Sequence, residues 1–115
     1  MHEYSVVASL MEIILAEAKR QGADSVLKVV VSVGQRSNIE KTLLVSAFEA
    51  LKVEYEILEK AEIVIITEEI LFSCKDCDHS FHSLQSPICP LCGSKNTEIV
   101  KGREIRLESL ELELP

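Results

Sequence analysis

The sequence CKDC at residues 74–77, followed by CPLCG at residues 89–93, contains every cysteine in this chain of 115 residues. Two CxxC pairs that are separated by eleven residues are typical of a metal site with four thiolate ligands. The two residues between the cysteines of each pair allow a tight turn that aims both sulfurs at one point and leaves backbone N–H groups free to bond the thiolates. The pattern predicts a zinc site formed by Cys74, Cys77, Cys89 and Cys92.

Three other uses of these cysteines compete with zinc. Two disulfides would require an oxidising compartment, and the first residues contain no basic, apolar and small-residue export signal. A thioredoxin-type dithiol uses one CxxC pair rather than two. Iron is the closest rival, because CPxCG is also a knuckle of rubredoxin-like proteins. Those proteins surround their iron with a packed aromatic core, whereas this chain has three Phe, two Tyr and no Trp, so zinc is preferred.

The composition indicates a globular, cytosolic protein that binds neither nucleic acid nor membrane. Hydrophobic residues make up 47% of the chain, but charged residues such as Glu12 and Glu17 interrupt the apolar stretches, so we expect no membrane span. Twelve basic against nineteen acidic residues give a net charge of −7. Zinc with four thiolates adds about −2. The charges around the cysteines cancel, and no aromatic run offers a surface on which bases could stack.

Apolar periodicity predicts two helices, over residues 4–21 and 37–53, and three strands, over residues 26–33, 62–67 and 105–114. Gly22 is expected to cap the first helix. The sequence from Ser37 to Glu40 matches a capping box, in which the Ser37 hydroxyl bonds the Glu40 amide and the Glu40 carboxylate reaches back. In the last strand the alternation shifts phase at Ser109 and Leu110, where we expect a bulge or a change of buried face.

The last strand alternates leucines with charged residues, which indicates a half-buried antiparallel strand that needs a sheet to join. We therefore expect the cysteine segment to be an insertion. The predicted domains are residues 1–69 plus 103–115, which form one α+β domain, and residues 70–102, which form a zinc ribbon. The α+β domain is expected to place two helices on a sheet of about three strands.

The amino terminus predicts a second metal site. His2, next to a free terminal amine, can close chelate rings through the amine, its own amide nitrogen and its imidazole, and the amide or carboxylate of Glu3 can fill a fourth position. This nitrogen-rich, square-planar set suits Ni(II) or Cu(II) rather than zinc. The alternative interpretation is an ordinary surface histidine.

Several segments resemble, in the right order, the HypA/HybF family of nickel-incorporation proteins for nickel–iron hydrogenase: MHEYSVVASL, VVVSVGQRS, SAFEAL, the two CxxC pairs and the closing GxEIRLxSLE. The resemblance implies a nickel metallochaperone in which His2 and Glu3 bind Ni(II) and the four cysteines hold structural zinc. It further implies that Glu40 contributes to the nickel site. The implied partners are the nickel-handling GTPase HypB, the hydrogenase large subunit and, in some bacteria, urease maturation proteins.

The role of two histidines is left open. His79 and His82 follow the first cysteine pair and could exchange with a thiolate, or they could be solvated loop residues.

No Ser/His/Asp triad, phosphate-binding loop or catalytic carboxylate pair can be assembled, so we expect no enzyme. A zinc-ribbon adaptor that binds other proteins, and a rubredoxin-like electron carrier, are the alternatives to a nickel chaperone.

Overall fold

The structure is a computed structural model that describes residues 2–83 and 86–115. The chain divides into two compact units. The helical unit contains the chain up to Ser32, Ile39–Ile66 and Arg106–Pro115, and the cysteine unit contains Val33–Asn38 and Thr67–Ile105. The cysteine unit is thus wider than the expected segment of residues 70–102. No helix in the described ranges is long and apolar enough to cross a membrane.

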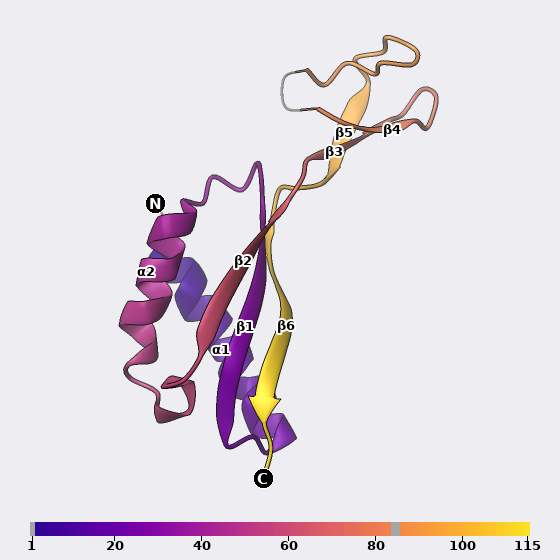
Figure 1. The fold of residues 1–115 in the computed structure, drawn as a ribbon. Coiled ribbons are helices and arrows are strands. Elements are labelled where there is room, and N and C mark those ends of the chain that lie inside the picture. The colour runs from indigo at the N-terminus through magenta and orange to yellow at the C-terminus, as the bar shows by residue number, and fades with distance from the viewer. Residues whose placement is uncertain (1, 84–85) are drawn as a thin grey trace. The chain divides into compact units, whose positions relative to one another are not determined.

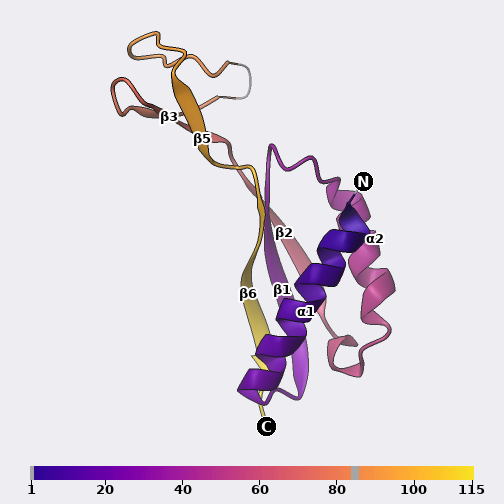
Figure 2. The same ribbon diagram turned by 180° about the vertical axis from the view of Figure 1, so that it is seen from behind.

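The helical unit places two helices against a three-stranded sheet, which confirms the predicted α+β class. Its helices are α1 (Glu3–Gln21) and α2 (Lys41–Lys52), followed by a short 3-10 helix, η1 (Glu56–Leu58). The strand order is β2-β1-β6, with β1 at Ser25–Gly34, β2 at Glu62–Glu68 and β6 at Ile105–Glu113. Figures 1 and 2 show α1 and α2 together on one side of this sheet.

The core of the helical unit follows from the periodicity of the sequence. α1 buries residues at helical spacing: Val7, Leu10, Met11, Ile14 and Ala18. α2 adds Leu44, Ala47 and Phe48, and β1 adds a run of buried valines. Gly22 ends α1 with φ 67°, and the amides of Gly22 and Ala23 donate to the carbonyls of Lys19 and Ala18. This pair of bonds is a Schellman motif, so the predicted glycine cap is confirmed.

β6 runs antiparallel to β1, because Asp24 donates its amide to the Glu113 carbonyl at 2.8 Å and Gly34 donates to the Glu104 carbonyl at 2.9 Å. Along β6 the half-buried residues are Ile105, Leu107, Leu110 and Leu112. Two exposed residues follow one another in the middle of this row. The predicted shift of phase at Ser109 and Leu110 is therefore confirmed.

The predicted capping box at the start of the second helix is wrong. The Ser37 hydroxyl donates instead to the Gly34 carbonyl at 2.8 Å, and Asn38 adopts a left-handed φ of 61°. α2 begins only after Glu40, whose amide donates to the carboxylate of Glu3 at 3.1 Å. A carboxylate from the other helix thus accepts the Glu40 amide in place of the Ser37 hydroxyl, and Ser37 instead completes a turn.

The cysteine unit contains a second small sheet, of order β4-β3-β5, with β3 at Leu71–Cys74, β4 at Ser80–His82 and β5 at Thr97–Lys101. Both pairings are antiparallel. Its buried cluster has five members, of which two are cysteines: Ile70, Phe72, Cys74, Phe81 and Cys89. So small a core cannot stabilise a domain by apolar burial alone, so this unit depends on its cysteines.

Two glycines allow three backbone segments of the cysteine unit to meet. A Cβ on Gly34 would lie 2.3 Å from the carbonyl of Gly102, and a Cβ on Gly102 would lie 2.7 Å from the Cα of Ile70. The amide of Arg36 donates to the Gly102 carbonyl at 2.7 Å, and the side chain of Gln35 accepts the Ile70 amide at 2.8 Å. These contacts explain why residues 33–38 belong to the cysteine unit.

Candidate metal centre

The two CxxC turns, here called knuckles, span residues 74–79 and 89–94 and have the same backbone hydrogen bonds. In each knuckle the amide of the first cysteine donates to the carbonyl five residues later, at 2.9 Å. The carbonyl of that cysteine accepts the amide four residues later, at 2.8 to 2.9 Å. The residue at this fourth position is left-handed in both knuckles, with φ 62° at Asp78 and 73° at Gly93. Glycine and aspartate tolerate this conformation better than most residues, so the sequence suits the turn.

The four sulfurs form one cluster. All four Sγ atoms lie within 4.8 Å of one another, with 3.6 Å between Cys74 and Cys92 and 3.7 Å between Cys77 and Cys89. These separations far exceed a disulfide bond of about 2.05 Å. A tetrahedral zinc ion with Zn–S bonds of about 2.3 Å requires sulfurs about 3.8 Å apart. The geometry therefore fits a zinc ion bound by four cysteines, and no other group of three metal-ligating side chains converges in the described ranges.

Backbone amides polarise these sulfurs. Burial raises the pKa of Cys89, but the N–H groups of Cys92 and Leu91 donate to its sulfur and bring that pKa to about 7. The His79 amide lowers the pKa of Cys77, whereas burial and the neighbouring thiols raise it to about 12. Four thiolates this close repel one another, so the cluster can ionise fully only around a cation.

Asp76 connects the two knuckles. Its carboxylate accepts hydrogen bonds from the Ser94 hydroxyl and from the Asn96 side-chain amide, the latter at 3.2 Å. These two bonds, Ser94 first, lower the pKa of Asp76. The Lys75 amide also donates to the Asn96 carbonyl, at 2.9 Å. The sequence carries no signal of this contact, because its partners lie 18 to 20 residues apart and no short motif links them.

Neither histidine near the first knuckle joins the sulfur cluster. The Nδ1 atom of His82 lies 2.9 Å from the Ile70 carbonyl and 3.6 Å from the Glu69 carboxylate. The ring of His79 stacks on Phe81, with 6.2 Å between the ring centroids. Both side chains are therefore held by other contacts, and neither is brought to the sulfurs.

At the amino terminus the structure brings Glu3 and Glu40 together. Met1, and with it the proposed amine ligand, lies outside the described residues. His2 is exposed and precedes α1, where its carbonyl accepts the Val6 amide at 2.8 Å. Glu3 is only 6% exposed, because its carboxylate reaches the Glu40 amide. That bond is the main cause of the lowered pKa of Glu3.

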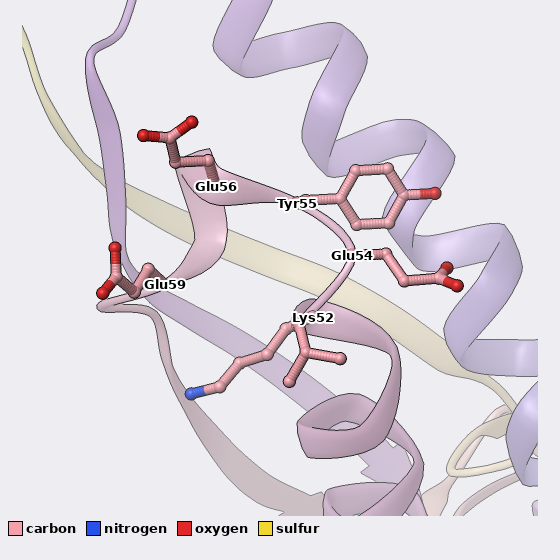
Figure 3. Close-up of a pocket in the computed structure, with 6 residues that line it drawn as sticks. Lys52, Glu54, Tyr55, Glu56 and Glu59 are labelled. Atoms are coloured by element: carbon pink, nitrogen blue, oxygen red, sulfur yellow. The ribbon is translucent and has the colours of Figure 1, made fainter.

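A surface pocket of about 480 Å³ follows the end of α2 (Figure 3), but its charged groups do not converge. Figure 3 shows the carboxylate of Glu54 on the opposite side of the pocket from those of Glu56 and Glu59. The amine of Lys52 is already bound to the Ala61 carbonyl at 3.0 Å and to the Glu49 carboxylate at 2.9 Å. This pocket offers no acid–base pair.

The chain matches, over residues 1–112, the family model described as "Hydrogenase/urease nickel incorporation, metallochaperone, hypA". It belongs to the HypA family. A hydrogenase/urease maturation factor HypA from Helicobacter pylori is 43% identical over 97% of both chains. A hydrogenase maturation factor HypA from Aquifex aeolicus is 43% identical over 99% of both.

The fold agrees with this assignment. The solution structure of the Ni metallochaperone HypA from Helicobacter pylori superposes with a TM-score of 0.78 at 42% identity, covering all of both chains. The resemblance drawn from the sequence is confirmed. Because HypA proteins are metallochaperones or maturation factors, the prediction that this protein is not an enzyme is confirmed as well.

Proposed function

We propose that this HypA protein binds Ni(II) at its amino terminus and delivers it to the large subunit of a nickel–iron hydrogenase. The observation that carries the proposal is the arrangement of the first residues. His2 is exposed immediately before α1, and the Glu3–Glu40 hydrogen bond fixes the start of that helix. A metal-binding residue is thus open to solvent and to a partner, while the backbone beside it is held in place.

The proposed nickel ligands are nitrogens. The Glu3 carboxylate is engaged with the Glu40 amide at 3.1 Å, so the amide nitrogen of Glu3 is the better fourth ligand. The other three are the terminal amine, the His2 amide and the His2 imidazole. The first amides of a helix have no helical acceptor, and the positive end of the helix dipole favours their deprotonated form. Glu40 takes part by holding Glu3 through its backbone amide, and its own side chain is exposed to solvent.

We further propose that the ion held by Cys74, Cys77, Cys89 and Cys92 is zinc and that its role is structural. Sulfur separations of 3.6 and 3.7 Å support a tetrahedral ion, and the five-residue core explains why the unit needs one. Rubredoxin-type iron is the alternative. Metal analysis of purified protein should find about one zinc per chain and no iron, and a coloured iron protein would reject the proposal.

A metal site that is open on one side suits the delivery of nickel, because a carrier must release its metal by ligand exchange with the recipient. We propose the cytosol as the place of this exchange, and the GTPase HypB, the hydrogenase large subunit and urease maturation proteins as partners. A zinc-ribbon adaptor without nickel function remains the second candidate. In that case the amino terminus would be irrelevant to activity.

Nickel titration of protein with a native amino terminus tests the proposal. We expect one equivalent of Ni(II) per chain, no specific binding in His2→Ala, and weakened or altered coordination when residues are added before Met1. His82→Ala is the matched control, because His82 is equally a surface histidine but belongs to the cysteine unit. Nickel binding by His2→Ala with the parent stoichiometry and spectrum would reject the amino-terminal site, because the metal would then have to bind His79, His82 or the thiolates.

A further inference from the structure

The outer edge of β6 is open. β6 is nine residues long and lies at one end of the strand order, so no strand in the described part of the chain pairs with its outer side. The Glu113 carbonyl faces β1, since it accepts the Asp24 amide. Alternate residues of a strand turn their N–H and C=O groups to opposite edges, so those of Leu112 and Leu110 point outward. Such an edge is a template for one more strand.

An apolar groove accompanies this edge. A hollow of about 330 Å³ lies between β6 and the end of α1, and its apolar wall is a row of leucines: Leu107, Leu110, Leu112 and Leu114. Glu17 and Gln21 of α1 contribute to the lining. Leu114 is 57% exposed, and the other three leucines are half-buried. An added strand would present every second side chain to this row, at a spacing of about 7 Å.

The charges beside the groove are mainly negative. Glu108 is paired with Arg106 at 3.5 Å, and Glu17 is paired with Arg20. Glu111 and Glu113 are exposed, and neither makes an ion pair with another described residue. A second copy of the strand would add its own glutamates, in a chain whose net charge is already −7. Opposite charges on a neighbouring strand stabilise pairing and like charges oppose it, so a basic strand fits best.

We propose that β6 is a docking edge for an extended segment of a partner protein in which apolar residues alternate with lysine or arginine. The backbone of the segment pairs with Leu110 and Leu112, its apolar side chains enter the leucine groove, and its cations reach Glu111 and Glu113. This surface includes none of the residues assigned to nickel or zinc. Its test is therefore independent of both metals.

The probe is a nine-residue peptide of alternating valine and lysine with blocked ends, titrated into isotopically labelled full-length protein. We expect amide shifts and slower hydrogen exchange at Leu110 and Leu112, and loss of binding when glutamate replaces lysine. Methylating the valine amides or, separately, the lysine amides blocks opposite edges of the peptide. One methylated peptide should bind roughly tenfold more weakly and the other should bind normally, because only one edge can pair with β6.

Protein variants locate the groove. Leu112→Ala and the more exposed Leu114→Ala should each weaken peptide binding severalfold, whereas Ile13→Ala on α1, where residue 13 is 54% exposed, should not. Equal binding by both methylated peptides would overturn the proposal, because side-chain contacts alone would then account for the binding. It would also be overturned by unchanged binding in both leucine variants, or by a concentration-dependent dimer of the protein that protects the same amides and excludes the peptide.

Discussion

The two units of this protein are stabilised in their folded states by different means. In the helical unit two helices and β1 bury a row of apolar side chains, including Phe48 and Ile14, that offset the conformational entropy of the chain. The cysteine unit has a cluster of five buried residues, and two of these are cysteines of the sulfur cluster. The difference teaches that a short segment with few apolar residues can still be ordered when a metal ion supplies the cross-link.

The largest effect should come from the cysteines. Replacing Cys89 with Ala, or removing the metal with a chelator, should unfold the cysteine unit and leave the α1 and α2 signal in circular dichroism unchanged. Zinc in small modules contributes roughly 10 to 16 kcal/mol of apparent binding free energy. Leu91→Ala is the control, because this residue lies in the same knuckle and is 70% exposed. Loss of helix signal together with zinc would contradict independent stabilisation.

A substitution in the core of the helical unit should destabilise that unit and leave the zinc site intact. Phe48→Ala removes a side chain that is 2% exposed, and it should cost about 3 to 5 kcal/mol of unfolding free energy. Zinc content should stay at one per chain. Val45→Ala, on the same helix but 36% exposed, should cost far less. Chemical denaturation measures both, and equal costs would show that the helices do not pack as described.

The close approach of Gly34 and Gly102 gives an intermediate effect. Gly34→Ala places a Cβ 2.3 Å from backbone atoms and should destabilise the cysteine unit by about 1 to 3 kcal/mol. Gly93→Ala meets no atom within 4 Å, so it should cost only the left-handed strain of about 1 kcal/mol. Thermal melting of the zinc-bound protein compares the two variants. A greater loss in Gly93→Ala would place the constraint in the knuckle instead.

The smallest effect concerns the Glu3–Glu40 contact. The pKa of Glu3 is lowered in the folded protein by the Glu40 amide, so this contact stabilises the fold above the ordinary glutamate pKa of 4.5. The stabilisation should fade as the pH falls through the folded pKa. Glu3→Gln should therefore lower the melting temperature slightly at pH 7, and its difference from the parent should shrink in acid. Glu12→Gln, on the exposed face of α1, serves as the control.

Short sequence patterns predicted the helices and strands. They carried no signal of contacts between residues that lie far apart in the sequence. The spacing of Val7, Leu10 and Ile14 and the glycine at position 22 determine α1, because both signals lie within one helix. The start of α2 escaped prediction, since the carboxylate that binds its first amide comes from Glu3, 37 residues away. The spacing of the four cysteines predicted that their sulfurs converge, which the structure shows. The role of Asp76 is seen only in the structure, where the Ser94 hydroxyl donates to it.

The shared backbone of the two knuckles has a consequence for how this sequence can vary. Each knuckle sets its turn with its own main-chain hydrogen bonds and one left-handed residue, so the side chains between its cysteines do not set that turn. Asp76 has a separate role, because it joins the two knuckles through Ser94 and Asn96. The residues between the cysteines already differ completely, being Lys75 and Asp76 in one knuckle and Pro90 and Leu91 in the other. Substitution of Lys75, Pro90 or Leu91 can therefore change the charge and the apolar surface beside the sulfur cluster while the main-chain turns that hold the cysteines stay the same.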